Sequence, residues 1–396
     1  MDIETLRADT PACRERVHLN NAGAALPPSA VIEAVRAHFE LDCTLGGYEA
    51  ADARADAISD AYRAIGALVG APPRNIALAD SATAAYTQAL TSIPFERGDL
   101  IFTTRNDYVS NQLQLLSLES RCGVRVRHAP DAPEGGVDVA AIERMIRDTK
   151  PRAVCVTHVP TNSGLIQDAG SIGRICREHD VLYLVDGCQS VGQMPIDVEA
   201  LGCDYFSATS RKFLRGPRGA GFLYVSDRVL ERGLGPLMID LHGAEWLEER
   251  SYRLVDSAKR FETFEFAWGH MLGMAEAARY ALALGLDAIE TRIRALADRL
   301  RNRLGAIDGV RVLDRGPMLC GIVSAALPLH DSHAVMLALR ERGINTSAQA
   351  RPSALLDFDT KGVRSSLRFS PHCYNTEDEI DSAAEALREV LRTLRR

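Results

Sequence analysis

Residues 152–190 decide the fold of this chain. Two apolar segments, Arg152-Ala-Val-Cys-Val-Thr-His-Val159 and Val181-Leu-Tyr-Leu-Val185, flank a helical pattern over 171–179. Neither apolar segment alternates with polar residues, which is typical of strands that are buried on both faces. A strand, a helix and a second strand in this order indicate a parallel sheet that helices cover on both sides. The sequence therefore predicts an α/β protein.

The same pattern extends beyond this stretch. Apolar runs of strand length precede and follow it, at Ile76–Ala79, Tyr205–Ala208 and Ala220–Val225. Asp138 precedes an amphipathic run that begins at Val139, and it suits a helix N-cap because its carboxylate can accept from the free N–H groups there. The middle of the chain is thus predicted to form one large sheet with its helices.

From about Ala275 the pattern changes to long helices rich in Ala, Leu and Arg. Short strands and further helices follow, at 310–313, 321–327, 334–342 and from 377 onward. This mixture is typical of an α+β unit. We predict a large domain over residues 20–270 and a smaller domain formed by both chain ends, residues 1–19 and 271–396.

Composition excludes several classes of protein. The 396 residues are 46% hydrophobic and 25% charged, unlike a disordered or fibrous chain. No window approaches the roughly 18 consecutive apolar residues of a membrane span, and the acidic start Met1-Asp-Ile-Glu4 is unlike a secretory signal. Nine cysteines, never spaced C-x-x-C, argue against a disulfide framework or a zinc ribbon. We therefore expect a cytoplasmic protein with no metal site and no membrane partner.

Charge adds one clue. The formal net charge is -7, and only four of the 46 basic residues are lysines, namely Lys150, Lys212, Lys259 and Lys361. The arginines are spread along mixed-sign helices and form no basic block with aromatic residues, so no nucleic-acid partner is expected. Because lysine is rare, a lysine that follows a strand stands out.

Two chemically active side chains follow neighbouring strands. Asp186 comes directly after Val185, and Lys212 follows the short strand Tyr205–Ala208. Ligands of open α/β sheets bind at this edge. A lysine can hold an aldehyde cofactor as an imine, and a carboxylate keeps a pyridine nitrogen protonated. The spacing therefore suggests a Schiff-base cofactor site, although a buried Asp–Lys ion pair or a solvated lysine would fit it too.

Asp186-Gly-Cys-Gln189 together with Thr209-Ser-Arg-Lys212 resembles the pyridoxal-phosphate enzymes of the class V aminotransferase and cysteine desulfurase group. The resemblance extends over nearly the whole chain, from Val17-His-Leu-Asn-Asn-Ala-Gly23 to Arg368-Phe-Ser-Pro-His-Cys-Tyr-Asn-Thr376. It implies fold type I, with a large domain around a mostly parallel seven-stranded sheet and a smaller α+β domain. It also implies pyridoxal 5'-phosphate as the cofactor and a homodimer with active sites at the interface.

The resemblance implies a role for each residue around the cofactor ring. Lys212 would form the internal aldimine and later move protons. Asp186 would pair with the ring nitrogen, and Gln189 would donate to the ring hydroxyl oxygen. Tyr108 stands where the group carries an aromatic residue or a histidine that stacks on the ring, although a core tyrosine would fit there nearly as well.

The resemblance also implies where the cofactor phosphate binds. Ala82 and Thr83 begin a helix after an apparent strand, and the N–H groups of a helix start bind phosphate. An ordinary helix cap without a ligand has the same arrangement. Thr209 and Arg211 flank the lysine as further phosphate ligands. Arg211 replaces a more usual histidine and keeps the positive charge.

Two residues are predicted to bind an amino-acid substrate. Arg368 suits the α-carboxylate, because a planar guanidinium pairs with a carboxylate through two hydrogen bonds. Asn162, within Thr161-Asn-Ser-Gly164, follows a predicted strand and is expected to contact the substrate or the ring hydroxyl.

One departure from the group concerns sulfur chemistry. Its cysteine desulfurases carry a nucleophilic cysteine on a loop before the C-terminal arginine motif, but Gly343–Pro352 here contains none, and Cys373 would have to be repositioned. A persulfide-forming desulfurase is therefore not expected. Gly46-Gly-Tyr-Glu49 and Arg260-Phe-Glu-Thr-Phe-Glu265 resemble instead the branch with ergothioneine-type C–S lyases and isopenicillin N epimerase-like proteins.

Three reactions share this machinery once Lys212 has taken the Cα proton from the external aldimine to give a quinonoid. Loss of a β-substituent makes the enzyme a lyase, reprotonation on the opposite face an epimerase, and reprotonation at the cofactor carbon an aminotransferase. We predict a C–S lyase that eliminates sulfur from a cysteine conjugate or its sulfoxide. The alternatives are an aminotransferase, an amino-acid epimerase, and a catalytically idle scaffold that binds the cofactor.

Overall fold

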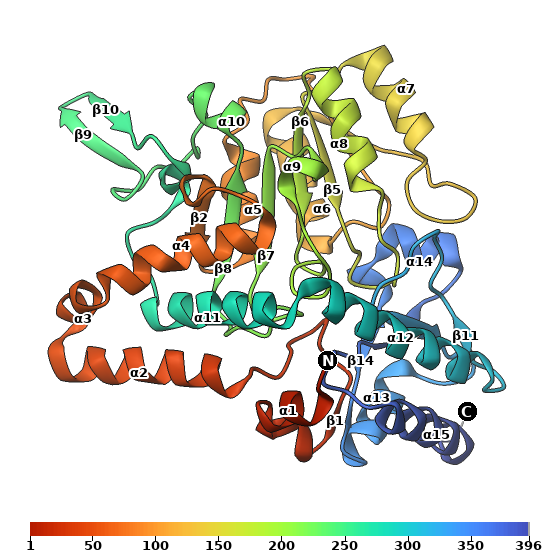
Figure 1. Cartoon of the computed structure of the whole chain (residues 1–396). Coiled ribbons are helices and arrows are strands. Elements are labelled where there is room, and N and C mark those ends of the chain that lie inside the picture. Colours follow the sequence, from red (N-terminus) through yellow and green to blue (C-terminus); the bar gives the residue numbers. More distant parts are fainter. Residues whose placement is uncertain (395–396) are drawn as a thin grey trace.

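A seven-stranded sheet forms the centre of the computed structural model, which describes residues 1–394 (Figure 1). In spatial order the strands are β2 (Ile76–Ala79), β8 (Gly221–Val225), β7 (Tyr205–Thr209), β6 (Leu182–Asp186), β5 (Ala153–Thr157), β3 (Leu100–Thr103) and β4 (Arg125–His128). Neighbouring strands are parallel except where β8 is one of the pair. The predicted α/β fold with a mostly parallel seven-stranded sheet is confirmed.

Helices cover both faces of this sheet, because successive strand residues point to opposite sides. In β5, Val154 and Val156 pack in one core and Ala153 and Cys155 in another. The first core is shared with α4 (Ala55–Val69), α7 (Val139–Thr149), α8 (Ala169–Glu178) and α11 (Trp268–Leu284), the second with α5 (Ala82–Thr91), α6 (Val109–Cys122) and α10 (Asp227–Glu231). Burial on both faces explains why these strands show no polar alternation.

A four-stranded antiparallel sheet forms a second, smaller unit. Its strands in spatial order are β11 (Arg311–Val312), β12 (Val323–Ala326), β15 (Ser365–Phe369) and β14 (Ser347–Ala350), and its core is shared with α12 (Leu286–Gly305), α13 (Ser332–Glu341) and α15 (Glu377–Thr393). β1 (Val17–His18) pairs in parallel with β13 (Ile344–Asn345) beside it. Residues near the start of the chain thus pair with residues among its last hundred.

Two consecutive helices connect the larger unit to the smaller one. α11 packs against α2 (Ser29–Leu45) and α4, whereas α12 packs against α15, β11 and β12. Gly285 separates the two helices with a φ of +83°, a left-handed conformation that favours glycine. The division into residues 20–270 and residues 1–19 with 271–396 stays a prediction. The packing of α11 and α12 places the transition near Gly285.

The remaining elements lie at the periphery. They are α1 (Ile3–Ala8), α3 (Gly47–Ala53), α9 (Val198–Leu201), α14 (Leu355–Lys361), the hairpin of β9 (Ala244–Glu248) and β10 (Ser251–Leu254), and short 3-10 helices at Pro11–Arg14, Pro73–Asn75, Ala258–Phe261 and Arg351–Ser353. The β9–β10 hairpin and the α2–α3 turn project from the body on the same side in Figure 1. Within residues 1–394, no helix combines the length and the apolar character needed to cross a membrane.

Candidate active site

The segments that follow β2, β3, β5, β6 and β7 meet at one edge of the large sheet, because these strands run in the same direction. We call this the carboxyl edge, and the opposite one the amino edge. The carboxyl edge carries every predicted site residue except Arg368, which lies on β15 of the smaller sheet. The site is therefore built where the two units meet.

Lys212 lies at the carboxyl edge and is buried. The residue is only 7% exposed, and its Nζ lies 5.7 Å from the centroid of the Tyr108 ring. Burial lowers the pKa of Lys212, while the nearby Cys188 and Asp186 oppose the shift. Among the described residues, no carboxylate oxygen lies within 4.0 Å of this nitrogen. The Asp–Lys ion pair that the spacing also allowed is thus not formed, and a lowered pKa favours the neutral amine that attacks aldehydes.

Asp186 ends β6 and is 3% exposed. Asn111 Nδ2 donates to its Oδ2 at 2.8 Å, and the backbone N–H of Cys188 donates to its Oδ1 at 2.9 Å. Both donors are neutral. The carboxylate is therefore held in place, and within the described residues no basic side chain forms an ion pair with it at 4.0 Å or less, so it can attract a protonated ring nitrogen.

Thr161 joins two of the predicted site residues. Its Oγ1 accepts from Gln189 Nε2 at 2.9 Å and from Arg368 Nη1 at 2.8 Å. Arg368 also donates to Asn20 Oδ1 at 3.2 Å, and Gln189 donates to the Ala22 carbonyl at 3.1 Å. Because Nε2 uses both of these acceptors, a ring hydroxyl would have to replace one of them. The role of Gln189 as a donor to the ring hydroxyl stays a prediction.

Asn162 faces a different group. Its Nδ2 donates to Asp357 Oδ2 at 2.5 Å, and the same carboxylate pairs with Lys361 Nζ at 2.8 Å. The structure therefore brings Thr161, and not Asn162, to Arg368. Thr161 and Asn162 are consecutive residues of a turn, and their side chains have different surroundings. A contact between Asn162 and the substrate stays a prediction.

Arg368 is a buried cation with an unused donor. The residue is 4% exposed, and within residues 1–394 its Nε has no hydrogen-bond partner. Burial, together with the nearby charge of Arg211, lowers the pKa of Arg368 to about 10. A buried guanidinium without an anion is costly. A carboxylate ligand would supply both the missing charge and the missing acceptor.

Gly221 brings the start of α5 against the end of β7. It pairs with Thr209 in the sheet, and a Cβ atom on it would lie 2.7 Å from the Ala208 carbonyl oxygen and 3.0 Å from the Ala82 nitrogen. Only glycine fits such an approach. Two of the predicted phosphate ligands, Ala82 and Thr209, are thus held close together.

The first turn of α5 offers free donors. Ser81 caps the helix by accepting from the Ala84 N–H at 3.1 Å. The first N–H groups of a helix, here those of Ala82 and Thr83, have no partner inside the helix, and such groups bind phosphate. The predicted cradle is therefore geometrically available.

Arg211 contacts the N-terminal segment. Its Nη1 donates to the Gly23 carbonyl, and burial together with the nearby Arg218 lowers the pKa of its guanidinium. The contact ties residues beside the lysine to the turn that follows β1. Its role as a phosphate ligand stays a prediction.

Three residues at the site escaped the sequence reasoning: Asn111, Cys188 and Thr161. Asn111 follows Tyr108 by three residues and lies in the first turn of α6, and this closeness to a predicted site residue could have found it. Thr161 adjoins the residue that was selected. Nothing in the sequence distinguishes Cys188 from an ordinary core cysteine.

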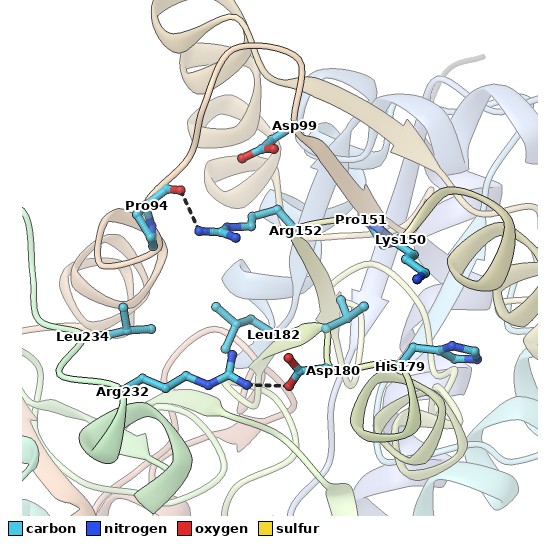
Figure 2. A pocket seen from close by; sticks show the side chains of 11 residues that line it. Pro94, Asp99, Lys150, Pro151, Arg152, His179, Asp180, Leu182, Arg232 and Leu234 are labelled. Atoms are coloured by element: carbon cyan, nitrogen blue, oxygen red, sulfur yellow. Dashed lines mark hydrogen bonds and ion pairs between the residues drawn. The ribbon is translucent and has the colours of Figure 1, made fainter.

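A hollow of about 520 Å³ lies at the amino edge of the sheet (Figure 2). Asp99 and Arg152, which precede β3 and β5, are among the residues that line it. Figure 2 shows that both arginines of the hollow contact the chain itself, since Arg152 donates to the Pro94 carbonyl at 3.1 Å and Arg232 pairs with Asp180. The predicted site residues lie at the other edge, and their role stays a prediction.

Known families and proteins match nearly the whole chain. The family model for class V aminotransferases matches residues 17–382. A probable cysteine desulfurase of Methanothermobacter thermautotrophicus is 29% identical over 397 residues, with 98% of each chain covered. The cysteine desulfurase IscS of Shewanella pealeana is 29% identical over 352 residues, which cover 86% of this chain and 82% of that protein.

Solved structures share the fold. The apo structure of a cysteine desulfurase from Thermococcus onnurineus NA1 superimposes with a TM-score of 0.91 at 24% identity, covering 100% of this chain and 99% of that one. The cystine C–S lyase C-DES, solved with its reaction product cysteine persulfide, superimposes with a TM-score of 0.84 at 22% identity, covering 96% and 99%. These likenesses concern the fold and leave the reaction to be argued from the residues.

Proposed function

Because the chain belongs to the class V aminotransferase family, we propose that it is a C–S lyase acting on a cysteine conjugate or on the sulfoxide of one. The enzyme depends on pyridoxal phosphate, the cofactor of this family. The resemblance of residues 46–49 and 260–265 to the branch with ergothioneine-type C–S lyases supports this choice of reaction.

The residues at the carboxyl edge fit the cofactor. When bound, pyridoxal phosphate supplies an aldehyde that combines with amines and a ring that accepts an electron pair. In our proposal Lys212 binds the aldehyde, Asp186 holds the ring nitrogen, and Tyr108 lies against the ring. Within the described residues, the buried Gln189 Oε1 and Arg368 Nε have no partner in the chain, which supports a ligand between them.

The phosphate is assigned to the donors around Gly221. In our proposal the N–H groups of Ala82 and Thr83 bind it, the hydroxyl of Thr209 turns to it from the Ala220 carbonyl, and Arg211 adds positive charge from the residue before the lysine. These groups hold one end of the cofactor while Lys212 holds the other. Two attachments of this kind fix the orientation of the ring.

In our proposal the substrate is oriented by Arg368 and deprotonated by Lys212. The guanidinium would bind the α-carboxylate and turn the Cα–H bond toward Lys212. The substrate's own amine would replace Lys212 on the aldehyde, and the freed neutral amine of the lysine would then take the Cα proton. The Cβ–S bond then breaks, and sulfur leaves with the bonding electrons as a thiolate from a conjugate or as a sulfenate from a sulfoxide. Addition of water releases the rest of the amino acid as pyruvate and ammonia.

The segment that pairs with β15 carries this proposal. Residues 343–352, where cysteine desulfurases of the family hold their nucleophile, contain no cysteine and include β14, whose Ser347 lies opposite Arg368. The residue that faces the carboxylate-binding arginine across the sheet thus carries a hydroxyl and no thiol. Direct release of sulfur requires no protein thiol there, whereas persulfide formation does.

Cys188 and Cys373 are the cysteines next to predicted site motifs, and both are poor nucleophiles. Cys188 is next to Asp186, and burial raises the pKa of its thiol. Cys373 is fully buried beside His372, and burial raises its pKa to about 11. The thiolate is the attacking form of cysteine, so raised pKa values keep both side chains unreactive.

Product analysis tests the proposed reaction. The holoenzyme is incubated with S-alkyl cysteines, their sulfoxides and free cysteine, each deuterated at Cα. Pyruvate, free sulfur product, keto acid and residual deuterium are measured together. We expect pyruvate and free sulfur product in equal amounts, with no sulfur added to the protein in its mass spectrum. The Cys373→Ala variant should give the same products.

Other outcomes would overturn the lyase. A keto acid that keeps the sulfur, with the cofactor left in its amine form, identifies an aminotransferase. Loss of deuterium with inversion at Cα identifies an epimerase. Cofactor binding without turnover of any substrate identifies an idle scaffold. A persulfide trapped on any cysteine identifies a desulfurase.

We further propose that the enzyme is a homodimer. Large apolar side chains are exposed on the β9–β10 hairpin, on the segment before it and at the α2–α3 turn, with Trp246 79% exposed, Met238 77% and Tyr48 72%. These elements project from the body on one side (Figure 1), and large apolar side chains exposed together on one side support a protein contact there. Light scattering should give the mass of a dimer, and Trp246→Glu should shift it toward the monomer.

The cysteines support a cytoplasmic location, which we also propose. All nine are free, and seven of them are buried as ordinary core residues. Free thiols in this number suit a reducing compartment. Fractionation of the source cells with an antibody to the protein tests this placement, and recovery outside the cytoplasm would contradict it.

A further inference from the structure

We propose that Asn111 is a positioning residue, which orients Asp186 toward the ring nitrogen of the cofactor. The inference rests on one part of the proposed function, namely that Asp186 is the partner of that nitrogen. It does not depend on which reaction the enzyme catalyses.

The contact between the two side chains is short and buried. Asn111 Nδ2 donates to Asp186 Oδ2 at 2.8 Å, and the residues are 2% and 3% exposed. The backbone N–H of Cys188 holds the other carboxylate oxygen. A carboxylate has about four acceptor positions on its two oxygens. One donor on each oxygen fixes its plane and leaves the remaining positions for the ring N–H.

The start of α6, which carries Asn111, is fastened to two strands. The Thr157 N–H donates to Asp107 Oδ1 at 2.5 Å, and the Thr103 hydroxyl donates to Asp107 Oδ2. The Tyr108 N–H donates to Thr157 Oγ1 at 3.1 Å. These bonds join β3 and β5 to the residues just before the helix. Asn111 therefore reaches Asp186 from a rigid support.

The start of α6 brings the predicted stacking residue and the support of Asp186 close together in the chain. Tyr108, whose ring centroid lies 5.7 Å from Lys212 Nζ, is the residue just before α6, and Asn111 is in the first turn of that helix. One fastened segment therefore carries both residues. Removing the amide of Asn111 should affect the ring nitrogen and leave the stacking residue in place.

The neighbouring Gln112 provides a matched control. Its Nε2 donates to Thr103 Oγ1 at 3.2 Å and to the Thr104 carbonyl at 3.3 Å, so it anchors the same helix without contacting Asp186. Gln112→Leu and Asn111→Leu each remove one amide from α6. A difference between them therefore reports on Asp186 and not on the anchoring of the helix.

The experiment follows the ring nitrogen itself. The wild type and the Asn111→Leu, Asn111→Ala, Gln112→Leu and Asp186→Asn variants are loaded with pyridoxal phosphate labelled with ¹⁵N in the ring, and the ¹⁵N chemical shift is recorded against pH. We expect the ring nitrogen of both Asn111 variants to lose its proton at a pH about one to two units lower than in the wild type. Their kcat should fall about tenfold or more. KM should change little, because Arg368 is untouched.

Each outcome decides one question. If the Asn111 variants titrate like the wild type, or if Gln112→Leu shifts the titration equally, Asn111 has only a structural role and the inference is wrong. If Asp186→Asn leaves the ring nitrogen unchanged, the assignment of Asp186 fails, and the inference fails with it. Thermal unfolding of each loaded variant identifies any that do not fold, and two substitutions at Asn111 keep the test decisive.

Discussion

The two edges of the large sheet use buried and half-buried charges in different ways. At the amino edge, Arg228 pairs with Asp180 at 2.7 Å and with Asp204 at 2.9 Å, and Arg232 also contacts Asp180. At the carboxyl edge, Lys212 is more deeply buried than any of these cations, yet within the described residues no carboxylate pairs with it.

This difference separates stabilising charges from chemically active ones. Opposite charges that meet offset the cost of removing each from water. A buried cation without a partner lowers stability, and evolution retains such groups mainly where they bind or react. The pairing of charges therefore distinguishes Lys212 from the cations of the amino edge, which supports our proposal that the carboxyl edge is the reactive one.

Among substitutions at the two edges, Lys212→Ala should have the largest effect on activity. It removes the amine that binds the cofactor, so borohydride reduction should no longer attach the cofactor to any peptide, and turnover should vanish. Mass spectrometry of the digested protein measures the attachment. Lys150→Ala, which changes the lysine lining the amino-edge hollow, is the control and should keep both attachment and turnover. Attachment to Lys150, Lys259 or Lys361 would contradict the assignment.

Arg368→Ala should weaken substrate binding by about 2–5 kcal/mol, because it removes a desolvated partner of the α-carboxylate. The absorption spectrum of the bound cofactor should hardly change. Titration with an unreactive amino-acid analogue measures the affinity. Arg232→Ala at the amino edge is the matched control, and equal losses in the two variants would show that Arg368 does not contact the carboxylate.

Asp204→Ala should have the opposite effect to the two substitutions above: it should lower the free energy of unfolding and leave turnover unchanged. Its carboxylate accepts from the Tyr183 N–H at 2.9 Å and pairs with Arg228, so its removal leaves buried donors unpaired and costs about 3 kcal/mol of unfolding free energy. Asp186→Ala should instead lower turnover by orders of magnitude while the cofactor still binds. Urea unfolding and steady-state rates of both variants measure the two effects. Equal losses of stability and of turnover in the two variants would contradict the distinction between the two edges.

The smallest effect concerns pH. Burial lowers the pKa of Lys212 in the native state, so the unfolded chain binds more protons at pH values between the two pKa values. Stability then rises with pH in that window. Relative to Lys212→Met, the wild-type apoprotein should become more stable as the pH rises toward the ordinary lysine pKa of about 10.4. Urea unfolding at several pH values measures this, and a flat difference would contradict it. Lys150→Met tests whether loss of any lysine gives the same result.

Much of the fold was predictable because the sheet is buried on both faces. The apolar segments at 152–159 and 181–185 correspond to β5 and β6, and the predicted helix between them to α8. The cap at Asp138 is also confirmed, since its carboxylate accepts from the Ala141 N–H at 2.9 Å. Short-range patterns suffice here, because a strand or a helix start depends mainly on residues within a few positions of it.

The site was predictable where residues follow strands. Lys212, Asp186 and Gln189 come together because parallel strands deliver their ends to one edge, a rule that needs no coordinates. The choice between Thr161 and Asn162 could not be made in this way. It depends on how the turn at Thr161 and Asn162 faces Arg368, which lies in another sheet, more than 200 positions along the chain.

The sequence by itself determined the fold class, the cofactor chemistry and the absence of a cysteine from residues 343–352, since each depends on residue type and local order. Only the tertiary structure decided which charges are paired, which side chain donates a hydrogen bond to Asp186, and that Thr161 links Gln189 to Arg368. The physical reason is range. Secondary structure responds to near neighbours along the chain, whereas burial and hydrogen-bond pairing are set by contacts between segments that the sequence keeps far apart.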